Sequence, residues 1–410
     1  MPTATEFAKP VRVVLCRHAS QSCWGARVAR DLELALFGDP DKDRAERWEP
    51  LDLAAAIPLD EELEFRRFTA PPTAPADAGR YLDEALHTVV VVLVDRDLMA
   101  DGAFLDWLEA CAAQAGMTDK RHQLFVLLKG EEVSEDWRRQ PGRPGLARYQ
   151  TLLHRDLGEE SERIDWLGLR VLHAALRAAL RGTEVPPERK VRFFVSHAKR
   201  DGLALARALR DLLVQTTWLE GFYDAWDLNT DGPWDQQLED AVATSVLVAL
   251  RTDNYDQRPW CKLEVHWAEE YGAPMVMVDA RGGLVHAASC LPFEAAPCVR
   301  IPDGNLVRIL HAGLRVAAQA ALFQRRVFEL QKLGMLPTGP SLQTIPVQPG
   351  LGAIARACRL LESAPAPRYI CHPGPILQRG RLEAAKALAA SVEAEIGTPA
   401  DLLLAWEMAA

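Results

Sequence analysis

The sequence predicts an α/β protein in which parallel β-sheets are flanked by helices. Apolar runs of strand length recur along the chain, and stretches with helical spacing of apolar residues separate them. The clearest run, TVVVVLV at 88–94, is typical of a parallel strand that is covered on both faces. This alternation occurs twice, once before and once after a linker expected at 183–190, so we expect a duplicated unit.

The first block, residues 1–182, has the elements of one α/β unit. Its first strand is expected at 11–15, and apolar residues at helical spacing place a helix at 28–36. Residues 39–80 are rich in charge and proline, which predicts a long irregular connection. The later elements are expected as strands at 88–94 and 124–128 and as helices near 76–87, 104–115 and 164–180.

The second block, residues 191–300, repeats this order. Pro233 and Pro259 each stand where the first turn of a helix is expected, and Gly272 with Pro274 ends the second of these helices. The remaining elements are expected as strands at 191–195, 221–224, 246–250 and 275–278 and as a helix around 205–212.

The third block, residues 301–410, is a helical or partial α/β region. It opens with a long helix at about 306–333, which Gly334 stops. The later elements are expected as helices near 354–363 and 381–396 and a strand at 369–371. Two explanations remain open: the region packs onto a neighbouring domain, or the chain is a fragment of a longer protein.

The composition excludes several classes of protein. Of 410 residues, 49% are hydrophobic and 25% charged, as in a globular protein of about two to three domains. The net charge of −10 argues against a broad contact with nucleic acid. Without a membrane-spanning segment or a signal peptide, we expect a cytoplasmic protein with no membrane partner. The eight cysteines form no CxxC pair, so we expect buried thiols and no metal site.

Three polar segments of the second block follow predicted strands: FFVSHAKRD at 193–201, the loop at 224–232 and YDQRPWCKLE at 255–264. In open parallel sheets, ligands bind beyond the carboxyl ends of the strands. Glu264 falls in the second turn of a helix with apolar neighbours, where a carboxylate suits an oxocarbenium-like cation, as glycosidic cleavage requires. Each segment alone also has a plain structural interpretation: a strand end, a polar connection and a surface glutamate.

Together, these three segments resemble a TIR (Toll/interleukin-receptor) domain of the bacterial kind, over about 190–283. The resemblance implies a flavodoxin-like parallel sheet and an enzyme that hydrolyses NAD⁺. NAD⁺ would then be the substrate, and no cofactor is expected. Its products would be nicotinamide with ADP-ribose or a cyclic isomer. The resemblance implies that Glu264 is the catalytic residue. It implies that Phe193 and Ser196 border the nicotinamide ribose or ring. It further implies that the cleft mouth, and the loop that joins neighbouring TIR units, are lined by Trp226, Asp227 and Trp260. One departure from the family pattern is the bulky Trp234.

The resemblance also implies partners and a role. Such proteins self-associate through their TIR domains, serve anti-phage defence, and respond to a trigger such as a phage component or a nucleotide signal. The main alternative is a non-enzymatic TIR scaffold or adaptor that acts through TIR–TIR contacts. A third interpretation is an enzyme of similar fold that acts on nucleosides. Glu264 together with Trp260 favours the enzyme that cleaves NAD⁺, because an adaptor has no need of that acid.

The first block resembles the same domain in fold but not in chemistry. LCRHAS at 15–20 stands where FVSHAK stands in the second block, and VDRDLM at 94–99 stands where LRTDNY stands. The interval that leads to Glu264 in the second block leads to Trp107 in the first, which is not an acid. We therefore expect a degenerate, catalytically silent TIR-like domain, with Glu109 as the alternative acid if the loop is shorter.

Two further motifs are given structural interpretations. GLGAIA at 350–355 fits GxGxxA, but it follows a proline-broken segment and no acid ends a later strand at the required distance. Cys371 and His372 are adjacent in an extended segment, where neighbouring side chains point apart. We therefore expect the start of a helix at 350–355 and not a dinucleotide site. At 371–372 we expect the end of a strand and not a Cys–His dyad.

A regulatory or assembly role is expected for the third block, residues 301–410.

Overall fold

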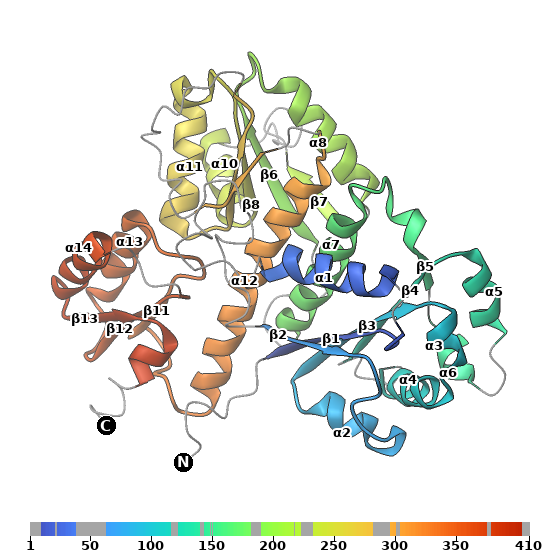
Figure 1. The fold of residues 1–410 in the computed structure, drawn as a ribbon. Helices are drawn as coiled ribbons and strands as arrows, with labels where there is room; N and C mark the ends of the chain where they lie inside the picture. Colours follow the sequence, from blue (N-terminus) through green and yellow to red (C-terminus); the bar gives the residue numbers. More distant parts are fainter. Residues whose placement is uncertain are drawn as a thin grey trace. The chain divides into compact units, whose positions relative to one another are not determined.

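The computed structural model separates into two compact units, drawn in Figure 1, and each is described by itself. The described residues of the first unit lie between 10 and 181, and those of the second between 190 and 403. The structure describes residues 10–20, 23–37, 63–115, 122–139, 143–147, 149, 151–181, 190–216, 218–222, 233–281, 296–300, 304–374 and 379–403. Among these residues, no helix is both long and apolar enough to cross a lipid bilayer.

The first unit contains a five-stranded parallel sheet in the order β2-β1-β3-β4-β5. Its strands are β1 (Val11–Cys16), β2 (Leu63–Phe68), β3 (His87–Val94), β4 (Gln123–Leu128) and β5 (Thr151–Leu153). Val13 of β1 is paired with Phe65 of β2 and with Val89 of β3. The central strands β1 and β3 are buried along their whole length, as expected of strands covered on both faces.

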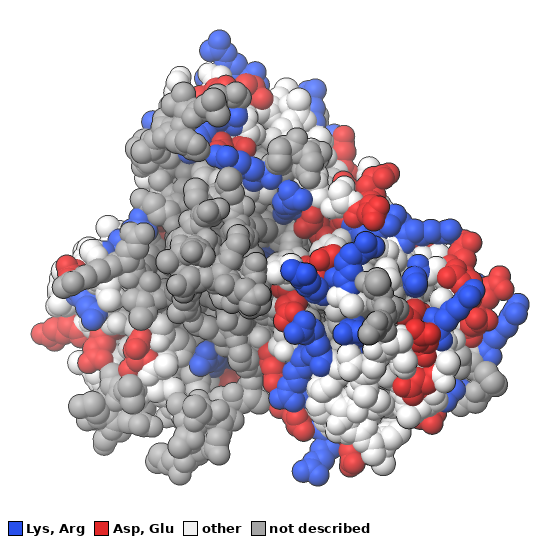
Figure 2. All heavy atoms as spheres, viewed as in Figure 1, with Lys and Arg blue, Asp and Glu red and all other residues white. Residues whose placement is uncertain are grey.

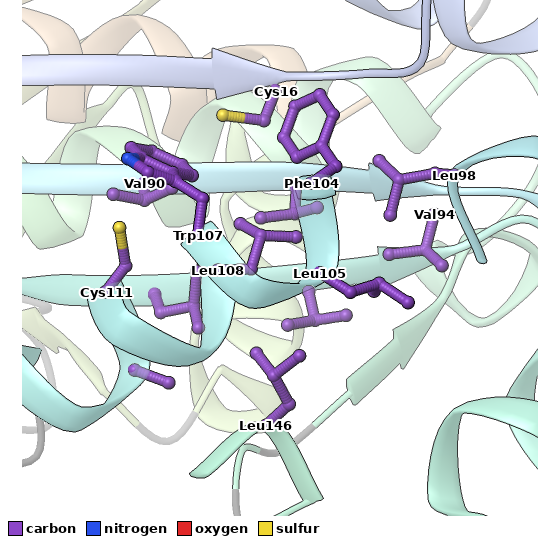
Figure 3. Close-up of a cluster of buried hydrophobic side chains, with 14 of the residues drawn as sticks. Cys16, Val90, Val94, Leu98, Phe104, Leu105, Trp107, Leu108, Cys111 and Leu146 are labelled. Carbon is purple, nitrogen blue, oxygen red and sulfur yellow. The ribbon is translucent and has the colours of Figure 1, made fainter. Parts of the chain in front are cut away.

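Helices cover both faces of this first sheet. They are α1 (Cys23–Phe37), α2 (Ala78–Asp83), α3 (Arg96–Ala100), α4 (Gly102–Ala115), α5 (Glu131–Arg138), α6 (Pro144–Ala147) and α7 (Arg163–Leu180), with short 3-10 turns η3 (Pro75–Asp77) and η4 (His154–Leu157). Helices α1 and α7 pack together, and α7 also packs on β1 and β3. Helices α2 and α4 pack on the other face, over the apolar cluster shown in Figure 3.

Strand β2 corrects the prediction of an irregular connection over 39–80. The pattern of this strand, LEFRRF, is interrupted by Arg66 and Arg67, so it lacks the apolar run of a central strand. It lies at the edge of the sheet, where charged side chains reach solvent. Arg67 forms an ion pair with Glu33 of α1 at 2.8 Å. Such pairs fit the interspersed acidic and basic side chains of the described surface in Figure 2.

The second unit contains a five-stranded parallel sheet in the order β7-β6-β8-β9-β10. Numbered along the chain, both sheets therefore have the order 2-1-3-4-5, which is the order of flavodoxin-like folds. The strands are β6 (Val191–His197), β7 (Leu219–Phe222), β8 (Val246–Arg251), β9 (Met275–Asp279) and β10 (Cys298–Val299). The helices are α8 (Leu203–Gln215), α10 (Trp234–Ala243) and α11 (Pro259–Tyr271), with a 3-10 turn η5 (Tyr255–Gln257). The predicted α/β class, with a repeated parallel sheet, is confirmed.

Helix α12 (Val307–Lys332) covers one face of this second sheet, although the sequence analysis placed it in a separate third block. It packs on β8, β9 and β10. The helix and the sheet approach each other closely at Gly313, where an added Cβ would lie 2.5 Å from the ring of Phe193 and 3.2 Å from Val246. A residue without a side chain is needed there because helix and strand approach so closely.

The last residues form a small α/β layer, which we call the C-terminal subdomain (342–403). Three parallel strands are ordered β11-β12-β13. Its elements are β11 (Leu342–Thr344), α13 (Leu351–Leu361), β12 (Arg368–Cys371), α14 (Arg379–Ala390) and β13 (Ala394–Gly397). The helix expected over 381–396 therefore ends early, at 390, and β13 follows. Helix α13 packs on α11, so this subdomain belongs to the second unit.

Candidate active site

Three side chains from separate parts of the second unit meet beside the carboxyl end of the sheet. Ser196 lies near the end of β6, Tyr255 begins the turn η5 after β8, and Glu264 lies in α11. The hydroxyl oxygens of Ser196 and Tyr255 are 2.6 Å apart. The Ser196 hydroxyl also donates a hydrogen bond to the carboxylate of Glu264. β6 and β8 are neighbours, with Ser196 paired to Ala249, and this pairing brings the two loops together.

The hydrogen bonds of this cluster have a defined direction. The Ser196 hydroxyl has a single proton, which it donates to the carboxylate of Glu264. With its proton used in this way, Ser196 accepts from Tyr255. Burial, and then the negative charge of Glu264, raises the pKa of Tyr255 well above its ordinary value. Tyr255 therefore keeps its proton, and the chain runs from Tyr255 through Ser196 to Glu264.

The cluster is almost completely closed to solvent. Ser196 is 1% exposed, Tyr255 is 0% exposed and Glu264 is 5% exposed. Glu264 lies on the buried face of α11 together with Cys261, Val265 and Ala268. Glu264 is therefore not the exposed side chain of a surface glutamate, and its role as the catalytic acid stays a prediction.

A second set of polar contacts fixes the loop that carries Tyr255. Asp201, which follows β6, accepts hydrogen bonds from the Thr252 hydroxyl at 2.8 Å and from the Asn254 backbone and side-chain amides at 3.0 and 2.8 Å. Burial would raise the pKa of Asp201, but the hydrogen bonds from Asn254 and Thr252 lower it below its ordinary value. Arg251, buried at the end of β8, contacts Asp256 with Nε–O distances of 3.0 and 3.1 Å. These contacts hold the turn η5 in place.

Trp260 lies on the exposed side of the same helix. It is 42% exposed and contacts Trp234, which is 47% exposed, with ring centroids 4.2 Å apart. The two indoles stand in the first turns of α11 and α10, where the structure offers an apolar surface to solvent. Trp226 and Asp227, the other two residues predicted at the cleft mouth, lie outside the described residues.

Phe193 does not join the cluster. It is completely buried and packs against Gly313 of α12. Side chains alternate between the two faces of a strand, so Phe193 points away from the face that carries Phe194 and Ser196. Phe194 packs with Leu247 and Val265 in the core beneath α11. The strand period, applied to this segment, would have separated Phe193 from Ser196 without a structure.

The corresponding position of the first unit is apolar. Trp107 follows the first residue of α4, Gly102, by the same interval that separates Glu264 from Pro259 in α11. Figure 3 shows Trp107 in the buried cluster with Cys16 and Cys111. Burial raises the pKa of both thiols, so they remain protonated.

Glu109 is directed elsewhere. Its carboxylate accepts hydrogen bonds from the backbone amides of Gly145 and Leu146 in α6, at 2.7 and 2.8 Å. This is the geometry of a helix cap.

Tyr255 is the member of the cluster that the sequence analysis missed. It lies in YDQRPWCKLE, the segment already singled out, but its hydroxyl faces Ser196 only after β6 and β8 pair.

In the described parts of the chain, no group of three or more His, Cys, Asp or Glu side chains could hold a metal ion. His372 is buried, and its ring Nδ1 lies 2.9 Å from the carbonyl oxygen of Pro373.

Residues 193–281 match the family model of the TIR domain. The match spans the elements from β6 to β9 and includes Ser196, Tyr255 and Glu264. These residues thus form a TIR domain, and the chain carries an additional parallel α/β sheet before it. Neither the comparison with curated proteins nor the comparison with solved structures gave a match.

Proposed function

We propose that this TIR-domain protein is an NAD⁺ hydrolase, which breaks the nicotinamide–ribose bond and releases nicotinamide with ADP-ribose or a cyclic isomer. The observation that carries the proposal is the buried carboxylate of Glu264, held by Ser196 and Tyr255 beside the carboxyl end of the sheet. Burying a carboxylate costs free energy, and carboxylates in such environments cluster at functional sites.

The chemistry follows from the charge that develops during cleavage. As nicotinamide leaves, the ribose takes on oxocarbenium character, and a carboxylate fixed in a water-poor site stabilises that positive charge. Glu264 supplies the charge, while Ser196 and Tyr255 hold its orientation before substrate arrives. Because the cluster is closed in this structure, the reaction requires it to open toward the ribose. The buried Phe193 has a packing role in this scheme and does not touch NAD⁺.

Self-association completes the proposal. A single small TIR sheet offers little concave surface around a dinucleotide, and a neighbouring copy would enclose the site. The surface of Trp234 and Trp260 is the side on which such a copy would lie. The sequence adds Trp226 and Asp227 as residues expected to take part in the same contact. The first unit, which has Trp107 where the acid would be, and the C-terminal subdomain regulate or assemble the enzyme. A phage component or a nucleotide signal would act as the trigger in an anti-phage response.

A non-enzymatic adaptor is the second candidate, favoured by one observation. Trp234 and Trp260 present two half-exposed indoles in contact, and such aromatic surfaces are enriched at protein–protein interfaces. This surface serves an enzyme that assembles and an adaptor equally well. Glu264 distinguishes the two, because an adaptor gains nothing from a buried acid.

The test is chromatography of NAD⁺ incubated with the purified full chain at high concentration, with and without a crowding agent. We expect release of nicotinamide. Glu264→Ala and Glu264→Gln should each lower turnover by about 10² or more, because both remove the stabilising charge. The matched control is Glu109→Gln, on the corresponding helix of the first unit, which should leave turnover unchanged.

Three outcomes would contradict this proposal. Full activity of a folded Glu264→Gln protein would exclude the charge-stabilisation mechanism. Intact NAD⁺ at every protein concentration, with self-association retained, would favour the adaptor. Release of free bases from nucleosides in place of nicotinamide would instead indicate a nucleoside-processing enzyme.

A further inference from the structure

The C-terminal subdomain is joined to the helix that carries Glu264. Helix α13 packs on α11, and its polar contacts are with Glu269, Glu270 and Tyr271, at the C-terminal end of α11 beyond Glu264. Its central interaction is a hydrogen bond of 2.7 Å from the backbone amide of Gly352 to the carboxylate of Glu269. The first turn of a helix carries unpaired amides and partial positive charge, so a carboxylate there is favourable. Glu269 of α11 thus caps the N-terminus of α13.

The glycines of the GLGAIA motif make this cap possible. A Cβ added at Gly350 or at Gly352 would overlap the carboxylate of Glu269. The helix N-terminus is therefore shaped around a carboxylate of the same chain. The pattern that resembles a dinucleotide-binding turn is explained by contact with α11.

Three further contacts surround this cap. The guanidinium of Arg356 on α13 lies 4.5 Å from the ring centroid of Tyr271, and the Tyr271 hydroxyl donates to Glu239 of α10 at 2.5 Å. Gly272, which ends α11 with a φ of 63°, packs so closely that an added Cβ would lie 3.2 Å from Ile345. The subdomain is thus bound to the end of α11 and, through Tyr271, linked to α10.

We propose that Glu269 is a positioning residue, through which the C-terminal subdomain holds α11 in the place that brings Glu264 to Ser196 and Tyr255. Glu264 and Glu269 lie on one continuous helix, so a shift of its C-terminal half moves the acid as well. The effect on turnover rests on the function proposed above. The effect on α11 itself does not, because it follows from the contacts alone.

The experiment uses the full chain with Gly352→Ala, Glu269→Ala and the double variant. The matched control is Gly380→Ala, in α14 of the same subdomain, where an added Cβ meets nothing within 4 Å. Two measurements are made: steady-state kinetics with NAD⁺, which give kcat and KM, and hydrogen exchange of the amides of α11 by mass spectrometry. Glu269→Gln is included because it keeps the shape of the cap and an acceptor oxygen.

We expect Gly352→Ala and Glu269→Ala each to lower kcat about tenfold with little change in KM, because misplacing a catalytic group impairs chemistry more than binding. Exchange of the α11 amides should become faster in both. The double variant should be no worse than either single variant, since both break one contact. Glu269→Gln should recover part of the lost kcat, and Gly380→Ala should behave as the original protein.

Three outcomes would overturn the inference: unchanged α11 exchange in Gly352→Ala, faster exchange with unchanged kcat, or fully additive losses in the double variant. If Gly352→Ala fails to fold, Glu269→Ala decides the question by the same two measurements. If the original protein releases no nicotinamide, the proposed function fails, and the exchange of α11 in Gly352→Ala alone decides whether the subdomain holds this helix.

Discussion

Replacing Tyr255 by Phe tests the directed chain of hydrogen bonds that ends at Glu264. The substitution removes one buried hydroxyl, which donates to Ser196 at an oxygen–oxygen distance of 2.6 Å, and leaves the packing of the ring intact. Ser196 keeps its hydrogen bond to Glu264. The expected loss is therefore that of one buried neutral hydrogen bond, about 1 kcal/mol in the free energy of unfolding.

The informative comparison is with the same substitution in a Ser196→Ala background. Ser196→Ala already removes the partner of this hydrogen bond, so the further change Tyr255→Phe should cost about 1 kcal/mol less there than in the original protein. A matched control is Tyr149→Phe in the first unit, which removes a hydroxyl that donates to the Ala112 carbonyl at 3.0 Å. Its cost should be the same with and without Ser196→Ala.

Native-state hydrogen exchange of β6 and β8 in the full chain measures these differences. Exchange reports the free energy of opening of the two strands that border the cluster. It therefore does not require the whole chain, which has several folded parts, to unfold in a single two-state transition. If the effects of Tyr255→Phe and Ser196→Ala add within about 0.3 kcal/mol, the two hydroxyls are not coupled, and the directed chain is refuted.

Three other predictions concern the first unit and assembly. Glu109→Ala should destabilise the first unit by about 1 kcal/mol, because it removes the cap of α6. It should leave nicotinamide release unchanged, and loss of activity in a folded variant would make Glu109 a catalytic residue. Turnover per molecule should rise with concentration over about a hundredfold range, as expected for a site completed by a neighbour. Trp226→Ala and Asp227→Lys should reduce turnover and oligomer size together, and a constant rate from a strictly monomeric protein would show that each site is complete alone.

The buried state of Glu264 changes how variants of this acid should be interpreted. From sequence, a cleft acid could be replaced with little effect on folding. In the structure, Glu264 is 5% exposed and accepts a hydrogen bond from Ser196, so its removal also alters a packed cluster. Activity of each Glu264 variant must therefore be compared at matched stability.

The sequence by itself was sufficient for the fold class and for the helix turn on which Glu264 lies. Strands such as 88–94 and 246–250 are buried on both faces, which produces apolar runs that are visible locally. Pro259 marks the start of α11, so the turn that carries Glu264 could be counted. Counting ten residues from Asp97, as Glu264 follows Asn254, led to Trp107, which lies in α4 within an apolar core. These features depend on neighbours in sequence, and for this reason they can be predicted from it.

Only the tertiary structure decided which side chains meet. Ser196 and Glu264 are 68 positions apart, and Glu269 and Gly352 are 83 positions apart. Nothing local in GLGAIA indicates that its glycines accommodate a carboxylate of α11, and nothing local around Tyr255 shows that its hydroxyl reaches Ser196. Both contacts arise because strand pairing and helix packing bring distant segments together. That depends on the free energy of the whole fold, which no window of sequence contains.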